Sequence, residues 1–173
     1  MTKNVAARRR RAYISPMHAF PNTPPRLDRI FYSYPLYFVT LCTHQRQRVL
    51  DNKELLLVFA EFAQSSFTRH NIAVGRFVIM PDHIHFFVRG PHDFRLGSWV
   101  GLLKQTLSMY LMKQGLQLPV WQRGFFDHVL RSSESYSEKW AYVYLNPVRK
   151  GLVENPADWP YAGEIIRVDS GSM

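Results

Sequence analysis

The segment His83-Ile84-His85 places two imidazole groups one residue apart. Side chains alternate between the two faces of a β-strand, so His83 and His85 share one face while Ile84 points to the other. Two imidazoles whose Cα atoms lie about 7 Å apart can converge on one divalent cation. Apolar residues flank the segment on both sides, so imidazoles buried there need polar partners. A metal ion is one such partner, and hydrogen bonds within the protein are the ordinary alternative.

Tyr142 is the second residue whose position suggests chemistry. It follows Trp140 by two residues, which places it about 200° around a helix from that indole. Tyr142 therefore falls outside the stripe of Tyr136, Trp140 and Tyr144, whose helical spacing is typical of core packing. A lone tyrosine on a polar helix face is usually an ordinary surface residue. The other members of this polar face are Glu138, Asn146 and Arg149.

A tyrosine beside a metal ion would have a definite use as a nucleophile. A free phenol has a pKa near 10, so about one molecule in a thousand is ionised at neutral pH. A cation next to a phosphodiester stabilises charge on the phosphoryl oxygens and favours the ionised attacker. The aryl phosphodiester that forms keeps a good leaving group, so a nucleic-acid hydroxyl can reverse the attack. Such chemistry suits strand transfer better than hydrolysis.

The hydrophobic pattern predicts the elements that position these residues. Runs rich in aromatic and β-branched residues predict strands, and apolar residues at helical spacing predict helices. Asp51 or Asn52 can cap the first helix, and the Asn146-Pro147 pair ends or kinks the last one. This order of elements favours an α+β sandwich in which the helices pack on one face of a mostly antiparallel sheet. The predicted strands are residues 34–43, 72–80, 83–89 and 125–130, and the predicted helices are 52–70, 96–114 and 134–145.

The composition indicates the class of protein and of partner. The 173-residue chain is long enough for one domain with a packed core, which we predict at residues 29–169. Its formal net charge of +9 favours a polyanionic partner such as nucleic acid. Cys42 is the only cysteine, which excludes an internal disulfide and fits a reducing compartment. From the Arg-rich first residues we expect no signal peptide, and the sequence has no apolar run of membrane-spanning length. We therefore expect a cytoplasmic, nucleoid-associated protein with no membrane partner.

Both ends of the chain differ from the predicted domain. Residues 1–28 are basic, are interrupted by prolines and lack hydrophobic periodicity. They form either a solvated flexible arm or a clamp that grips nucleic-acid phosphates, and the two interpretations are compatible. Residues 170–173 are predicted to be a frayed tail. The candidate phosphate contacts in the arm are Arg8, Arg9, Arg10 and Arg11.

Three segments taken together resemble REP-associated tyrosine transposases, which are single-tyrosine HUH transposases. They are MPDHIHFFV at residues 80–88, VWQRGFFDHVLR at 120–131 and YVYLNPVRKGLV at 142–153, followed by the aromatic-rich DWPYAG. The likeness covers roughly residues 34–163 in matching order. Three linked motifs are far more specific than one His-x-His pair.

The resemblance implies a ferredoxin-like α+β fold and a DNA strand-transferase that works through a covalent phosphotyrosine. It assigns His83 and His85 as ligands of Mg²⁺ or Mn²⁺, although imidazole by itself suits softer ions. The family pattern of a tyrosine four residues before a polar ligand falls on Tyr142 as nucleophile and Asn146 as metal ligand. The implied partner is single-stranded, hairpin-forming repetitive extragenic DNA. A monomer or a homodimer would bind it, and no nucleotide cofactor is expected.

Two positions depart from the pattern of these relatives, and a third matches a histidine whose role is open. Phe126 stands where the relatives often have histidine, so no role is carried over to it. Asp82 stands in place of a frequent asparagine. His128 matches a recurrent histidine of the family, either as a hydrogen-bonding core residue or as a helper in the active site.

Two other functions remain open from the sequence. A domesticated relative could bind DNA hairpins without cutting them, although a pure binder has no need of the two histidines and Tyr142 together. A small-molecule metalloenzyme with a His-x-His site fits the net charge and the basic arm poorly. Each candidate DNA contact outside the arm could also be a solvated surface residue. These candidates are Arg89, Lys104, Gln122, Arg123, Arg149 and Lys150.

Overall fold

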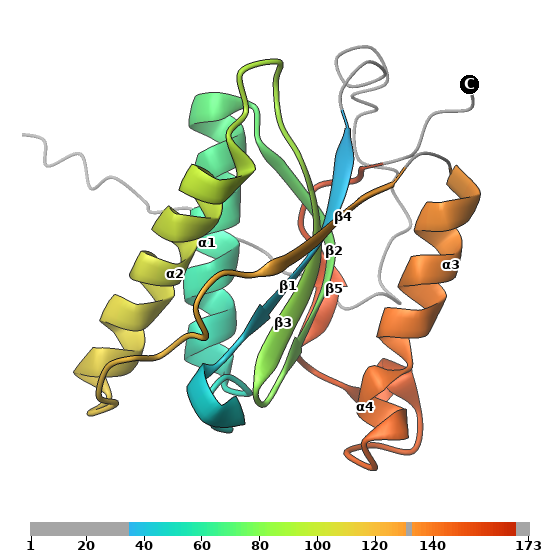
Figure 1. The fold of residues 1–173 in the computed structure, drawn as a ribbon. Helices are drawn as coiled ribbons and strands as arrows, with labels where there is room; N and C mark the ends of the chain where they lie inside the picture. Colours follow the sequence, from blue (N-terminus) through green and yellow to red (C-terminus); the bar gives the residue numbers. More distant parts are fainter. Residues whose placement is uncertain (1–34, 131–132, 169–173) are drawn as a thin grey trace, which may run out of the picture.

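The computed structural model describes residues 35–130 and 133–168, which form five strands and four α-helices (Figure 1). The strands are β1 (Leu36–Cys42), β2 (Ala73–Met80), β3 (His83–Arg89), β4 (Phe126–Leu130) and β5 (Ala162–Glu164). The helices are α1 (Lys53–His70), α2 (Leu96–Lys113), α3 (Ser133–Tyr144) and α4 (Asn146–Arg149). Two 3-10 turns are η1 (His44–Arg46) and η2 (Pro156–Asp158).

The five strands form one antiparallel sheet in the order β4-β1-β3-β2-β5. From β1 to β4 the chain follows the β-α-β-β-α-β connection of ferredoxin-like folds. The predicted α+β class and the mostly antiparallel sheet are therefore confirmed. In the register of the central strands, Cys42 lies opposite His83 and Thr40 lies opposite His85. The histidine pair consequently lies at the beginning of the central strand of the sheet, with a paired strand on each side.

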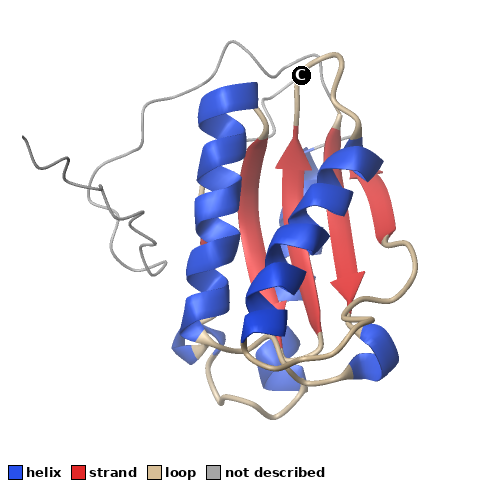
Figure 2. Cartoon of the chain, turned by 90° about the vertical axis from the view of Figure 1, so that its left-hand side faces the viewer, coloured by secondary structure: helices blue, strands red, loops and turns tan. Residues whose placement is uncertain are grey.

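α1 and α2 pack on one face of the sheet (Figure 2). Asn52 caps α1 as predicted, because its side chain accepts a hydrogen bond from the Leu55 N–H at 2.8 Å. α1 ends at Asn71, which adopts the left-handed conformation that asparagine tolerates at a helix terminus. The core under these helices is made of side chains fully excluded from solvent. Its members include Leu41, Leu55, Phe59, Phe77, Ile84, Phe86, Leu103 and Leu107.

α3 covers the opposite face of the sheet, so the expectation that the helices pack on one face is wrong (Figure 1). β3 explains the need for a second cover, because apolar residues occupy both of its faces. Ile84 and Phe86 enter the core under α1 and α2, whereas Phe87 enters a second core under α3. There the ring of Tyr136 meets Phe87 edge-on, with centroids 4.7 Å apart. Without α3, this apolar surface would remain in contact with water.

The other predicted elements lie within a few residues of their expected bounds. α3 ends at Tyr144 and α4 begins at Asn146 with Pro147 in its first turn, which is the break predicted from the Asn-Pro pair. α4, β5 and the two 3-10 turns are too short for a hydrophobic period to predict them. No helix in the described ranges is long and apolar enough to cross a membrane. The predicted arm at residues 1–28 and the tail at 170–173 lie outside the described residues.

Candidate active site and metal centre

His83 and His85 lie on the face of the sheet that α3 covers. They alternate along β3 with Ile84, whose side chain enters the core under α1 and α2. The two imidazole rings are close neighbours, with centroids 4.7 Å apart and planes at 79°. His83 is buried and His85 is half-buried. The shared strand face predicted from the His-x-His spacing is therefore confirmed.

Each imidazole uses its Nδ1 atom for a neighbouring side chain. The Nδ1 atom of His83 lies 2.6 Å from Oδ1 of Asp82, and that of His85 lies 2.8 Å from Oγ1 of Thr40. The ring of Phe38 stacks on His85, with centroids 5.4 Å apart. These contacts orient both rings and leave each Nε2 atom without a hydrogen bond among the described residues. Histidines that bind metal usually have an oxygen atom holding the second ring nitrogen in this way.

Asp82 connects His83 to a cation. Its second carboxylate oxygen, Oδ2, forms an ion pair with Nε of Arg46, and the two atoms are 2.9 Å apart. Arg46 and Gln45 have φ values of 58° and 51°, a left-handed backbone that is uncommon for residues other than glycine. The buried hydroxyl of Thr43 donates to the carbonyl of Asp82 at 3.0 Å and fixes this turn against the β2–β3 connection. An asparagine at position 82 would lack the negative charge that the Arg46 ion pair requires.

Burial keeps both histidines in the neutral form that binds metal. Burial first, and then the nearby His83 and Arg46, lower the pKa of His85 from 6.5 to about 3. Burial also lowers the pKa of His83, although the hydrogen bond and the negative charge of Asp82 oppose that shift. Neutral imidazole is the form that coordinates a metal ion. At neutral pH the two histidines can therefore coordinate a metal ion without first releasing a proton.

The histidine pair fits a divalent metal ion but supplies only part of a coordination shell. Two neutral imidazoles with unengaged Nε2 atoms form a suitable pair of donors. Within residues 35–130 and 133–168, no cluster of three or more His, Cys, Asp or Glu side chains could hold a metal. The other ligands would therefore be amide, water or phosphate oxygens, which Mg²⁺ and Mn²⁺ accept readily.

Tyr142 lies on the polar side of α3, as its helical phase predicted. Its side chain is 60% exposed, whereas Tyr136 and Trp140 are buried against the sheet. Tyr144 is half-buried and stacks on Trp140, with ring centroids 5.2 Å apart. The guanidinium of Arg149 lies 4.0 Å from the centroid of the Tyr142 ring and donates to the Tyr142 carbonyl. The aromatic stripe therefore belongs to the core. Among the α3 tyrosines whose burial is described, Tyr142 is the most exposed to solvent.

Lys139 brings one side of α3 close to the histidine pair. The ammonium group of Lys139 lies 5.4 Å from the centroid of Phe38, and that ring stacks on His85. Lys139 and Tyr142 are three residues apart and so are neighbours on the helix surface. Lys150, just beyond α4, lines a cavity beside the β2–β3 turn, next to the start of β3. Both lysines therefore lie near the histidine end of the sheet, and Tyr142 is a neighbour of Lys139 on the surface of α3.

Asn146 begins α4 and is half-buried. Its backbone carbonyl accepts a hydrogen bond from the Lys150 N–H at 3.0 Å. Its side chain makes no hydrogen bond to any other described residue. Among the described residues, no hydrogen bond or ring contact joins Tyr142 or Asn146 to the histidine pair. Their roles in a metal or DNA complex therefore stay predictions.

The predicted DNA contacts are spread over several parts of the molecule. Arg89 lies at the end of β3 opposite the histidines, and burial lowers the pKa of its guanidinium. Lys104 donates to the backbone carbonyls of Gln122 and Gly124, so its ammonium group holds that loop in place. Gln122 and Arg123 are exposed beside the end of β1, since the Gln122 N–H donates to the Cys42 carbonyl. Arg149 lies beside Tyr142, and Lys150 lies beside the β2–β3 turn. The four arginines of the arm, Arg8, Arg9, Arg10 and Arg11, lie outside the described residues.

β4 carries His128, for which the sequence left open a buried, hydrogen-bonding role or a role in the active site. His128 is exposed on this edge strand, so it is not a hydrogen-bonding core residue. Phe126 is also exposed, at 61%, and lies directly opposite Thr40 in the sheet. Thr40 in turn lies opposite His85, so the three side chains form a row across neighbouring strands on one face.

Sequence reasoning did not identify Thr40, Arg46 and Lys139 as part of the site. Lys139 was detectable, because it precedes Tyr142 by three residues on the same predicted helix. Thr40 and Arg46 lie far from the motifs in sequence, and only strand pairing and the η1 turn bring them to the histidines.

Comparison with known proteins gives a consistent family. Residues 32–143 match the model of the family described as Transposase IS200 like. A putative REP-associated tyrosine transposase of Haemophilus influenzae is 33% identical over 95 residues, which cover 49% of this chain and 54% of the relative. A REP-associated tyrosine transposase of Escherichia coli is 29% identical over 92 residues, which cover 51% and 52% respectively. The chain spans about half the length of these curated relatives.

The fold also matches a solved structure, that of a REP-associated tyrosine transposase bound to a REP hairpin. The TM-score is 0.64 at 20% sequence identity, and the match covers 86% of this chain and 97% of the other. The family match includes His83, His85 and Tyr142 and ends before Asn146.

Proposed function

Because this chain belongs to the IS200-like transposase family, we propose that it cuts single-stranded DNA and rejoins the ends through a phosphotyrosine on Tyr142. The family membership confirms the resemblance predicted from the three sequence motifs. The observation that carries the proposal is the placement of two chemical groups on one face of the sheet. These groups are an oriented pair of neutral imidazoles on β3 and a solvent-exposed tyrosine on α3. A protein that only bound DNA would not require both.

In this proposal His83, His85 and the Asn146 amide hold a divalent ion, Mg²⁺ or Mn²⁺. Thr40 and Asp82 occupy the Nδ1 atoms, so Nε2 would be the ligand atom of each histidine. The bound ion would supply positive charge to the phosphoryl oxygens and favour the ionised form of the attacking hydroxyl.

Tyr142 performs the covalent chemistry of the proposal. Its hydroxyl oxygen forms a bond to phosphorus while the bond from phosphorus to the sugar oxygen of the departing strand breaks. The phenolic proton passes to solvent, and the departing oxygen takes up a proton. In the rejoining step a DNA hydroxyl attacks the same phosphorus, and the phenol of Tyr142 leaves. Arg149, whose guanidinium lies over the Tyr142 ring, provides positive charge for the approaching phosphodiester.

The exposed edge of the sheet offers a surface for unpaired DNA. Four of the five residues of β4 are exposed, and Phe126 lies in the row that leads through Thr40 to His85. An exposed aromatic ring can stack on a nucleobase, a contact worth roughly 1–3 kcal/mol per base. We assign this role to Phe126, because its ring is 61% exposed on this edge strand, directly opposite Thr40.

The proposed substrate is a DNA hairpin with an unpaired flank. The REP-associated relative of known structure is bound to a REP hairpin, and the net charge of +9 favours a nucleic-acid partner. Gln122, Arg123, Arg149 and Lys150 are exposed near the histidine end of the sheet and are the proposed contacts outside the arm. The protein would act as a monomer or a homodimer.

One experiment tests the proposal directly. The protein is incubated with labelled hairpin DNA that carries unpaired flanks, with Mn²⁺, and is then run on a denaturing gel. A labelled band at the mass of protein plus DNA is expected, and it should disappear with EDTA or in Tyr142→Phe. If wild type forms no adduct on any hairpin with Mg²⁺ or Mn²⁺ but still binds the DNA, a hairpin-binding protein without cleavage activity replaces this proposal.

A further inference from the structure

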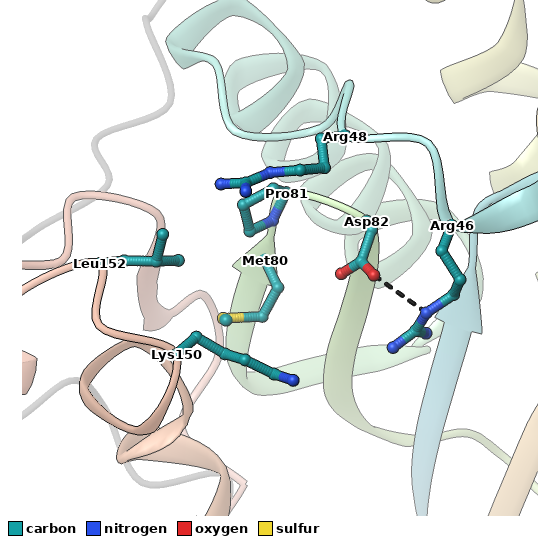
Figure 3. Close-up of a pocket in the computed structure, with 7 residues that line it drawn as sticks. All are labelled: Arg46, Arg48, Met80, Pro81, Asp82, Lys150 and Leu152. Carbon is teal, nitrogen blue, oxygen red and sulfur yellow. Dashed lines mark ion pairs between the residues drawn. The ribbon is translucent and has the colours of Figure 1, made fainter.

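A cavity of about 220 Å³ opens beside the β2–β3 turn, next to the histidine pair. Three segments distant in sequence line it: the connection from β1 to α1, the β2–β3 turn, and the chain that follows α4. The volume lies below the roughly 300–1,000 Å³ that is typical of sites for drug-sized ligands. The lining residues are Arg46, Arg48, Met80, Pro81, Asp82, Lys150 and Leu152 (Figure 3).

The charge of the cavity favours an anionic ligand. Three of its side chains are cationic and one is a carboxylate, which is already paired with Arg46 and His83. Arg48 and Lys150 make no ion pair or side-chain hydrogen bond with any other described residue. The two cations line different sides of the cavity and extend in opposite directions (Figure 3). Neither charge is neutralised within the described residues, so an anionic group that enters the cavity is attracted to them.

The remaining surface of the cavity is apolar. Met80 is buried at the end of β2, and Pro81 follows it at the turn. Leu152 lines the cavity from the chain after α4, while Lys150 extends toward the side where Asp82 lies (Figure 3). An inorganic anion would leave these apolar side chains unused. A nucleotide has both a phosphate for the cations and a base or sugar for Met80, Pro81 and Leu152.

Backbone hydrogen bonds form the walls of the cavity before any ligand binds. The Pro81 carbonyl accepts from the N–H groups of Val49 and Leu50 at 2.8 and 3.0 Å, and the Asp82 carbonyl accepts from that of Thr43 at 2.9 Å. The turn that carries two cavity residues is therefore fixed to the segment that carries Arg46 and Arg48. A site built in this way loses little conformational entropy on binding.

We propose that this cavity binds one unpaired nucleotide of the DNA strand next to the phosphate that Tyr142 attacks. The proposal rests on the proposed function, because it is the cleavage reaction that brings a strand past the histidine pair. Asp82 joins the two sites, since one of its oxygens contacts His83 and the other contacts Arg46. The nucleotide phosphate would contact Arg48, Lys150 would add positive charge from the other side of the cavity, and the base or sugar would pack on Met80 and Leu152.

Two variants and one matched control test the cavity. Arg48→Ala removes a cation, and Leu152→Trp fills the cavity without changing its charge. Arg69→Ala is the control, because it removes an exposed cation in the last turn of α1. Arg48 precedes the first turn of that 18-residue helix, and Arg69 is in its last turn, so the length of the helix, roughly 25 Å, lies between the control and the cavity.

The readout is affinity by fluorescence anisotropy in EDTA, for a hairpin with an unpaired flank and for the same hairpin with blunt ends. Arg48→Ala and Leu152→Trp should each weaken binding of the flanked hairpin by about tenfold and leave the blunt hairpin nearly unchanged. Arg48→Ala should also reduce the salt slope for the flanked hairpin by about 1. Arg69→Ala should affect both DNAs alike. Thermal unfolding shows whether each variant folds. If Leu152→Trp does not fold, Arg48→Ala still tests the proposal, because Arg48 is exposed and its removal should not affect folding.

The proposal is overturned if Arg48→Ala weakens both DNAs equally, as Arg69→Ala does, or if a folded Leu152→Trp binds the flanked hairpin like wild type. The adduct assay on wild type separates this failure from failure of the proposed function. An adduct together with normal binding by the cavity variants rejects the cavity alone. A selective loss of flanked-hairpin binding without any wild-type adduct rejects the cleavage reaction and retains the nucleotide site.

Discussion

The hydroxyl of Thr40 on β1 lies 2.8 Å from the Nδ1 atom of His85 on the neighbouring strand β3. The two residues are direct partners in the antiparallel register, so the contact depends on the pairing of β1 with β3. Thr40 contacts Nδ1, whereas Nε2 is the atom of His85 that we propose as the metal ligand. It therefore orients the imidazole without being a ligand.

Thr40→Val should raise the Mn²⁺ concentration needed for half-maximal adduct formation by roughly 10–100-fold, because the freed imidazole loses its fixed orientation. The maximal yield at saturating Mn²⁺ should change much less. Thr106→Val on α2 is the matched control, since it also removes a hydroxyl, one bonded only to its own helix at the Leu102 carbonyl. An unchanged Mn²⁺ requirement in Thr40→Val would remove Thr40 from the site.

His83→Ala and His85→Ala should each abolish adduct formation while most of the DNA affinity remains, because affinity comes mainly from phosphate contacts elsewhere. Adduct formation on a denaturing gel and hairpin binding by anisotropy are measured on the same preparations. His70→Ala, an exposed histidine at the end of α1, serves as the control and should behave like wild type. If either strand variant cuts at the wild-type rate with metal present, the histidines are not the metal ligands.

Tyr142→Phe should eliminate the adduct without loss of stability, since it removes one oxygen from a side chain that is 60% exposed. Tyr144→Phe is a matched control on the same helix and should leave most adduct formation intact, because that ring stacks on Trp140. The gel reports the adduct, and thermal unfolding reports stability. The reverse result, with the adduct lost only in Tyr144→Phe, would place the nucleophile on Tyr144 and keep the enzyme class.

Metal binding should depend weakly on pH between about 7.5 and 5.5. Imidazoles with the ordinary pKa near 6.5 would be about nine-tenths protonated at the lower pH, and a pair would lose roughly a hundredfold in affinity. Burial lowers the pKa of both histidines, to about 3 for His85, so both stay neutral further into the acid range. EPR of free Mn²⁺ with the Tyr142→Phe protein–hairpin complex should show a much smaller loss. A full hundredfold loss would mean that the rings are solvated and protonate normally.

Removal of residues 1–28 should weaken hairpin binding mainly at low salt and flatten its salt dependence. The segment contains Arg8, Arg9, Arg10 and Arg11 in succession, which would release counterions from DNA without reading bases. The preference for a hairpin over a plain single strand should survive. Anisotropy over a range of salt concentrations gives both quantities, and an unchanged salt slope would show that the arm does not contact DNA.

The sequence by itself determined the local features of the site. Alternation along a strand is enough to put His83 and His85 on one face, and the 3.6-residue helical period is enough to separate Tyr142 from the buried stripe of Tyr136 and Trp140. The Asn146-Pro147 pair locates the end of α3 because proline acts on the residue before it. Each of these rules involves residues within a few positions of one another. The resemblance to one family, which the match over residues 32–143 confirms, likewise needed no coordinates.

Only the tertiary structure decided which face of the sheet each helix covers. The pattern of α3 shows an apolar stripe, but a stripe does not specify the partner that buries it. The apolar groups on both faces of β3 require covers on both sides, and this requirement brings α3 to the face of the histidines. Partners such as Thr40 and Arg46, and the cavity shared by Arg48 and Lys150, come from strand pairing and loop contacts between distant segments. Such contacts follow from how the whole core packs, which no local period contains.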